Sequence, residues 1–182
     1  MEPSLKRRRL EEAIVSRNIT EGERALSDEA DANAIAASDG DWPPLLRAAR
    51  VGNIDVVRLL LDAGAAVDLR DANGRTALLI AAREGHQDVM QLLLEAGALA
   101  DGRDASGHTA LMIAAQEGHQ DVVRLLLDRK ANVDLQDCDG ATALLKGSEH
   151  GRLDAVLALL EHGADRDLTD DVGCTALMSA AR

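Results

Sequence analysis

The sequence predicts an all-α solenoid, in which helix-turn-helix units stack side by side and β-turn fingers join each unit to the next. The first observation behind this prediction is that several kinds of marker recur at a fixed spacing of 33 residues over most of the chain. The second is that two short helices cannot bury their own apolar faces, so units of this length have to stack. The third is the composition, which is 46% hydrophobic without any Phe or Tyr and with one Trp. Small aliphatic side chains suit thin, regular helical layers.

The 33-residue spacing is carried by independent markers. Thr-Ala-Leu occurs at residues 76–78, 109–111, 142–144 and 175–177. Glycines, aspartates and leucine pairs fall on the same step, at Gly52, Gly85, Gly118 and Gly151, at Gly74, Gly107, Gly140 and Gly173, at Asp71, Asp104, Asp137 and Asp170, and at residues 60–61, 93–94, 126–127 and 159–160. Agreement among unrelated markers makes a chance repeat untenable.

Each element of one unit has a local cause. Residues 71–74 begin with Asp and end with Gly, as a type I β-turn favours. The hydroxyl of Thr76 can cap a helix that spans residues 77–84. Gly85 suits the left-handed residue after that helix. Residues 86–95 then predict a second helix, because their apolar side chains share one face.

The unit at residues 104–127, which contains His-Thr-Ala-Leu-Met-Ile-Ala-Ala-Gln-Glu-Gly-His, resembles the ankyrin repeat. The resemblance covers about residues 39–182, with units at about 39–71, 72–104, 105–137 and 138–170 and a truncated fifth unit at 171–182. It departs from the family in the signature Thr-Pro-Leu-His, which here has Ala and Leu or Met in place of Pro and His. Because the chain stops within a first helix, we expect it to be a fragment of a longer protein. Residues 1–38 are expected to be flexible or partly helical.

Charge and cysteine content narrow the classes of function. The formal net charge is −12, of which residues 39–182 carry −10. Such a field disfavours nucleic-acid binding by the repeats, and without Phe and Tyr there is no base-stacking platform. Two cysteines fit a reducing compartment. With no signal peptide and no long apolar span, we expect a soluble protein of the cytoplasm, the nucleus or both, with no membrane partner.

Candidate catalytic and metal sites are weak. His lies two residues before Asp at residues 86–88 and 119–121, but no nucleophile accompanies either pair, so both histidines are interpreted as structural. Residues 137–140 lack the other ligands of a calcium loop. Cys138 and Cys174 have no Cys-x-x-Cys partner, so zinc is not expected, and both are expected to be exposed at the fingertips. We therefore predict no enzymatic activity, no cofactor and no metal.

A basic run, Lys6, Arg7, Arg8 and Arg9, is similar to a nuclear import signal. It leaves open whether the protein acts in the nucleus.

The resemblance implies that the positions varying between units line a concave face where partners bind. The candidate partner-binding residues at those positions are Arg70, Asn73, Arg75, Arg83, Arg103, Ser106, His108, Gln116, Gln136, Asp139 and Glu149. Because the arginines come first and the acidic residues last, we expect another protein as partner, with a basic segment facing residues 136–150. The main hypothesis is an adaptor or scaffold module. A nuclear regulator that sequesters or bridges transcription factors, and the recruiting module of a larger enzyme such as a ubiquitin ligase or a kinase, remain alternatives.

Overall fold

The computed structural model describes residues 3–27, 31–33 and 42–181. These residues form the helices α1 (Pro3–Ser16), α2 (Ile19–Ser27), α3 (Pro44–Val51), α4 (Ile54–Asp62), α5 (Ala77–Glu84), α6 (Gln87–Glu95), α7 (Ala110–Glu117), α8 (Gln120–Asp128), α9 (Ala143–Glu149), α10 (Leu153–Glu161) and α11 (Ala176–Ala180). Within them the only β-type pairing is an isolated bridge between Thr169 and Thr175. The predicted all-α solenoid is confirmed.

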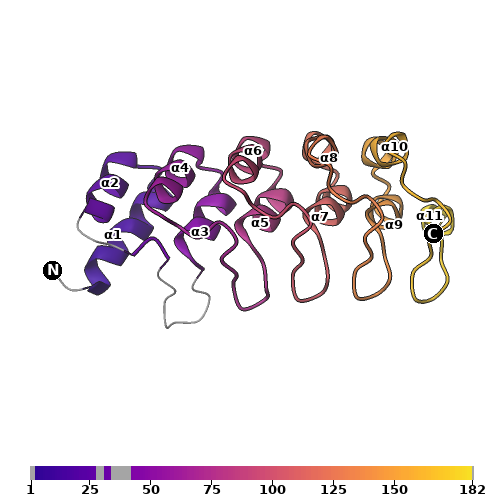
Figure 1. Cartoon of the computed structure of the whole chain (residues 1–182), viewed down its shortest axis with the longest axis horizontal. Coiled ribbons are helices and arrows are strands. Elements are labelled where there is room, and N and C mark those ends of the chain that lie inside the picture. The colour runs from indigo at the N-terminus through magenta and orange to yellow at the C-terminus, as the bar shows by residue number, and fades with distance from the viewer. Residues whose placement is uncertain (1–2, 28–30, 34–41, 182) are drawn as a thin grey trace.

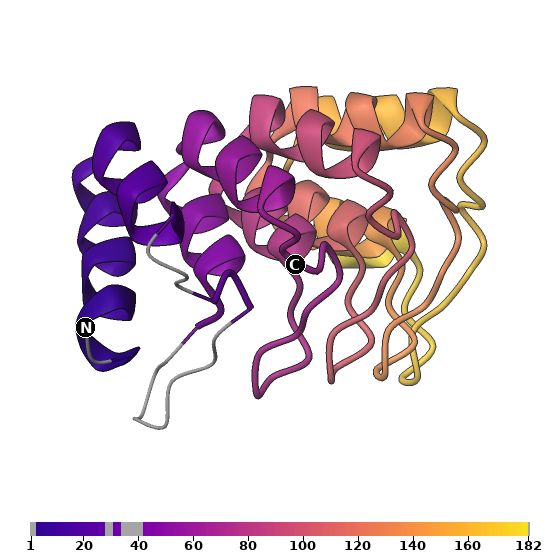
Figure 2. The same ribbon diagram turned by 60° about the vertical axis from the view of Figure 1, so that its left-hand side comes forward.

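The helices form two rows that run the length of the molecule (Figure 1). An inner row holds α1, α3, α5, α7, α9 and α11, and an outer row holds α2, α4, α6, α8 and α10, with neighbours in each row in contact. The loops that we call fingers, residues 68–75, 101–108, 134–141 and 167–174, all project from the same side of the inner row, as Figure 2 also shows. Side chains that differ by 33 residues therefore lie in rows along the molecule.

The core lies between the two rows. In α5 every residue from Ala77 to Ala82 is buried, because its short side chains contact the helices before, behind and beside it. In the outer helices α4, α6, α8 and α10 one leucine per helix is fully enclosed: Leu60, Leu93, Leu126 and Leu159 are each 0% exposed. Burying one such leucine contributes about 2 kcal/mol, so each layer adds a similar amount of stability.

In the unit that contains α5, the predicted bounds of the first helix are confirmed, whereas the second helix, predicted from residue 86, begins at Gln87 with His86 as its N-cap. Thr76 Oγ1 accepts a hydrogen bond from Leu79 N at 3.4 Å, and equivalent threonines cap α7, α9 and α11. Gly85 ends α5 with a φ of +75°, a conformation that costs other residues about 1–2 kcal/mol.

Residues 3–27 extend the stack with one more helical pair. Leu10 and Ile14 of α1 are buried, and α1 and α2 contact α3 and α4 respectively. An ion pair of 3.7 Å between Arg47 and Glu11 also joins α1 to α3. This pair lies in the segment for which the sequence left flexible chain and partial helix open. Residues 39–41, where the first unit was expected to begin, lie outside the described residues.

The last layer exposes apolar side chains. Leu160 is 38% exposed and Leu177 is 81% exposed, whereas Leu127, which corresponds to Leu160 one unit earlier, is 4% exposed. A pocket of about 430 Å³ opens there between α9, α10 and α11.

The unit at residues 138–170 contains a glycine inside its first helix, and we expect Gly147→Ala to stabilise the protein by about 1 kcal/mol. A methyl group at Gly147 would meet Val156 Cγ2 at 3.4 Å and Ala115 Cβ at 3.7 Å, which are ordinary contacts. The measurement is urea denaturation followed by circular dichroism. The matched control is Ala114→Gly, because Ala114 is fully buried at the same position one unit earlier, and it should lower stability by about 1 kcal/mol or more. A lower midpoint for Gly147→Ala would mean that Val156 cannot accommodate the methyl group.

Candidate partner-binding surface

The fingers owe their shape to the aspartate that begins each turn. Asp71 O accepts a hydrogen bond from Gly74 N at 2.9 Å, which closes the β-turn. Its carboxylate oxygen Oδ1 accepts from Asn73 N and Arg75 N, both at 2.9 Å. The same pattern recurs at Asp104, Asp137 and Asp170. The predicted turns are confirmed, and every finger presents its side chains in the same geometry.

Three of the expected partner-binding residues link the fingers to one another. Arg70 Nη1 donates to the carbonyl of Arg103, Arg103 Nη1 donates to Gln136 O at 3.0 Å, and Gln136 Nε2 donates to Thr169 O at 3.0 Å. These contacts fix the spacing of successive fingers. Arg70 and Arg103 remain exposed, so their charge still faces solvent.

Main-chain hydrogen bonds join neighbouring fingertips, and the side chains at the tips take no part in them. Ala105 N donates to Asn73 O, Cys138 N to Ser106 O and Asp171 N to Asp139 O, each at 3.0 Å. The exposed side chains of Asn73, Ser106 and Asp139 make no hydrogen bond or ion pair within the described residues.

At the first finger, the half-buried side chain of Arg75 is held by Asp71 and Trp42. Its Nε and Nη2 lie 2.7 and 2.6 Å from Asp71 Oδ2, and its guanidinium lies 4.8 Å from the ring centroid of Trp42. Arg50 of α3 lies 4.9 Å from the same ring. Burial alone would raise the pKa of Asp71, but hydrogen bonds from Arg75 and from the backbone outweigh burial and lower it below its usual 3.8. The structure therefore assigns Arg75 first to holding the finger.

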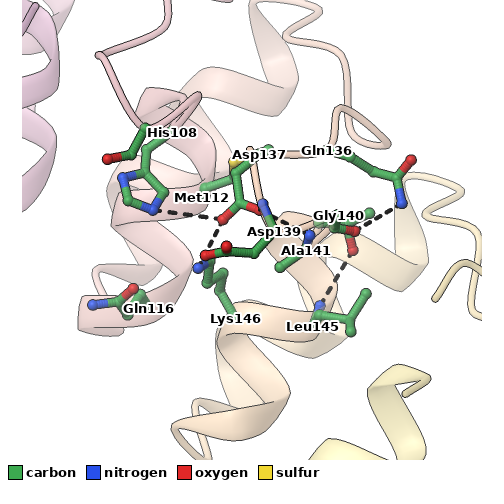
Figure 3. Close-up of polar contacts among 12 residues, drawn as sticks. His108, Met112, Gln116, Gln136, Asp137, Asp139, Gly140, Ala141, Leu145 and Lys146 are labelled. Carbon is green, nitrogen blue, oxygen red and sulfur yellow. Dashed lines mark hydrogen bonds and ion pairs between the residues drawn. The ribbon is translucent and has the colours of Figure 1, made fainter. Parts of the chain in front are cut away.

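A second polar cluster joins the units at residues 105–137 and 138–170 (Figure 3). The side chain of Asp137 is 0% exposed, and its Oδ2 lies 2.8 Å from Lys146 Nζ and 3.5 Å from His108 Nε2. His108 Nδ1 also lies 3.2 Å from Asp104 Oδ2. Burial alone would raise the pKa of Asp137. The hydrogen bonds from Lys146 and from the backbone N–H groups of Ala141 and Asp139 together have the larger effect, and they lower this pKa below its usual 3.8.

Lys146 is not among the candidate residues expected from the sequence, although equivalent positions in the other units single it out. Lys146 stands where the two preceding units have Ile80 and Ile113, and Ala141 stands where they have Arg75 and His108. In this unit the side chain that contacts the finger aspartate therefore comes from α9 and not from the finger itself.

One row of side chains at the ends of the inner helices lies on the side that faces the finger bases. We call this set the helix-end residues, and its members are Arg50, Arg83, Gln116 and Glu149. The face that carries these residues and the fingers is called the inner side. The orientation of the set follows from the contact of Arg50 with Trp42, because Trp42 occupies the finger-base position of Arg75 and His108. Figure 3 shows Gln116 on the side of α7 near His108 and Lys146. Arg83 and Glu149 are exposed, and neither side chain makes an ion pair within the described range.

The two histidines that precede Asp hold neighbouring units together. His86 Nε2 lies 3.1 Å from Arg50 O, and His119 Nε2 lies 2.8 Å from Arg83 O. In the next unit Arg152 Nε donates to Gln116 O at 3.0 Å. The structural interpretation of both histidines is confirmed, since each satisfies a carbonyl at the end of the preceding inner helix.

Of the two cysteines, only Cys138 is exposed as expected; the expectation for Cys174 was wrong. Cys174 is 8% exposed because it occupies the base of its finger, directly before the capping Thr175, rather than the tip. Among the residues that the structure describes, no three His, Cys, Asp or Glu side chains converge as metal ligands would.

The basic run at residues 6–9 belongs to the helix α1. Arg8 Nε bonds Glu12 Oε1 at 3.1 Å, in an exposed pair one helical turn apart. None of the helices in the described part of the chain is long and apolar enough to cross a membrane.

Comparison with known proteins agrees with this architecture. A model of ankyrin repeats (3 copies) matches residues 13–104, 45–137, 97–170 and 129–182, and so reaches into the segment that precedes the predicted units. Among curated proteins, the transcription factor TOXE of Cochliobolus carbonum is 38% identical over 48 residues, which are 26% of this chain and 11% of that protein. The chain thus spans about a tenth of the length of that relative. Its stacked helical pairs and its match to the ankyrin-repeat model show that the chain belongs to the ankyrin-repeat family.

Proposed function

We propose that the protein is a binding module for another protein, and that the partner contacts the helix-end residues and the fingertips. The observation that carries the proposal is the contrast between two sets of positions. Threonine caps, glycines and buried leucines repeat and build the stack. Asn73, Ser106 and Asp139, together with Arg83 and Glu149, differ from unit to unit, are exposed, and their side chains make no hydrogen bond or ion pair within the described residues. Exposed side chains whose polar groups are not used inside the protein are available to bind a partner.

The structure divides the candidate residues by role. Arg75, His108 and Gln136 make internal contacts, and we infer that their replacement would disturb the fingers as well as binding. Arg83, Ser106 and Glu149 are the positions at which a change tests binding alone.

The test is site-specific cross-linking in cells. Benzoylphenylalanine replaces Ser106 on a fingertip in one variant, and Gln91 on the outer helix α6 in the other. We expect a partner protein to be cross-linked from position 106 and not from position 91, since partners contact the inner side. Cross-linking from position 91 alone would place the binding surface on the outer row and contradict the proposal.

A nuclear regulator is the second candidate, favoured by the run at residues 6–9 and by the 48-residue similarity to a protein named as a transcription factor. Fluorescent fusions of the chain with and without Arg8→Gln and Arg9→Gln test it. Equal nuclear fractions for the two fusions would remove the support that the basic run gives.

A further inference from the structure

The charge of the inner side changes steadily along the stack. The helix-end residues are Arg50, Arg83, Gln116 and Glu149, which change from positive to negative over four units. The residues that follow them, Val51, Glu84, Glu117 and His150, do not reverse this trend, because the pairs carry net charges of +1, 0, −1 and −1 with His neutral.

The fingers show the same gradient independently. Residues 68–75 carry two basic and two acidic side chains, and residues 101–108 carry one basic and two acidic. Residues 134–141 and residues 167–174 each carry three acidic side chains and no basic one. The Arg70, Arg103, Gln136 and Thr169 positions, which link the fingers, likewise lose their charge toward the C-terminal end.

Ion pairs within the protein do not remove the charge gradient along the inner side. Lys146 is the basic side chain of α9, and its ammonium is already bound to the buried Asp137. Arg75 is likewise bound to Asp71. The exposed charges left for a partner therefore include Arg50, Arg70 and Arg83 at one end, with Arg103 in the next unit. At the other end they include the acidic Asp139, Glu149 and Asp171.

We propose that the inner side binds an extended protein segment with acidic side chains at one end, which face α3 and α5, and basic side chains at the other, which face the fingers 134–141 and 167–174. This inference rests on the proposed function and adds the chemistry and the orientation of the partner. A surface with two signs selects a segment with two signs, because like charges in contact are repelled. Nucleic acid and anionic lipid carry one sign only and match just one end.

The span of the surface sets the length of the segment. From α3 to α9 there are three steps between packed helices of about 8–10 Å each, or roughly 27 Å. An extended chain covers about 3.3 Å per residue, so about eight residues reach from Arg50 to Glu149.

Cys138 provides the readout, because it is an exposed thiol beside Asp139 at the acidic end. The probes are two synthetic peptides with four glutamates, two alanines and four lysines. One has an activated cysteine disulfide at its basic end, and the other at its acidic end. The protein carries Cys174→Ala, checked by circular dichroism, so that Cys138 is the single thiol. The rate at which each peptide disulfide exchanges with Cys138 is divided by the rate at which the same peptide exchanges with glutathione. This ratio corrects for the intrinsic reactivity of the peptide disulfide.

We expect the peptide activated at its basic end to react with Cys138 at least about fivefold faster, with a preference that falls as ionic strength rises. Arg83→Glu should reduce the preference about three- to tenfold, because it removes the anchor for the acidic end. Arg124→Glu, which makes the same charge change on the exposed side of α8, should leave it unchanged. A peptide of four lysines alone should be insensitive to Arg83→Glu.

Equal rates from the two ends, a preference that Arg83→Glu leaves unchanged, or a peptide of the same composition in scrambled order that reacts as fast as the block peptide would each overturn the inference. A partner cross-linked from position 106 together with any of these results would retain the proposed function and reject only the charge-oriented segment.

Discussion

Asp137→Ala should lower the free energy of unfolding by about 3 kcal/mol, one of the largest effects expected from a single substitution in this chain. The carboxylate is fully buried and accepts hydrogen bonds from the backbone N–H groups of Asp139 and Ala141 at 2.9 Å each. It also lies 2.8 Å from the ammonium of Lys146. Alanine leaves all three donors without the buried carboxylate that accepts from them. Urea denaturation followed by circular dichroism measures the loss.

The matched control is Asp170→Ala. Asp170 makes the same two backbone contacts, with Val172 and Cys174, and has no ion-pair partner in the described part of the chain. Its replacement should cost about 1–2 kcal/mol. Equal losses for the two variants would show that Lys146 adds nothing to the stability of its finger.

The same carboxylate predicts a dependence on pH. Its pKa is lower in the folded protein than its usual value of 3.8, so the folded state favours the ionised form. The stability that this preference contributes is fully present above pH 3.8 and is lost as the pH falls through the lower, folded-state pKa. Asp137→Asn should therefore show a shallower loss of stability below pH 4 than the parent. If both proteins lose stability equally as the pH falls below 4, this assignment is contradicted.

Gly85→Ala should destabilise the protein by about 3 kcal/mol for two separable reasons. The backbone of Gly85 has a φ of +75°, which costs alanine about 1–2 kcal/mol. In addition, a methyl group there would lie 2.7 Å from Nδ1 of His119, so the ring would have to leave its bond to Arg83 O.

Two further variants separate these causes. Gly97→Ala has the backbone cost alone, because its φ is +91° and nothing lies within 4 Å of the added methyl group, so it should cost about 1 kcal/mol. Gly85→Ala in a His119→Ala background should cost about the same as Gly97→Ala, since the steric conflict is gone. A full 3 kcal/mol loss in that background would mean that the ring of His119 is not the obstacle.

The elements that the sequence predicted well are those whose causes are local. The turn from Asp71 to Gly74, the cap by Thr76 and the end of α5 at Gly85 each depend on side chains within a few residues. The α1–α2 pair was harder to predict, because its apolar residues cover only about two turns of each helix and acquire a buried face only through contact with α3 and α4.

The candidate site was predicted by position but not by role. The sequence did not predict that Arg70 donates to Arg103 O or that Lys146 pairs with Asp137. Both contacts depend on the lateral distance between units, which a single sequence does not contain. Arg83, Ser106 and Glu149 remain predicted binding residues, and the experiments above test them.

The pair of arginines around Trp42 also has a spectroscopic consequence. Trp42 is the single aromatic residue of the chain, and it contacts Arg50 of α3 and Arg75 of the first finger. Its fluorescence emission therefore reports the opening of the α3 and α5 layers, whereas circular dichroism averages over every helix. In a stack stabilised by neighbouring layers the two signals need not change together. If the dichroism transition begins at a lower urea concentration than the emission transition, the array opens from the α9–α11 end toward Trp42.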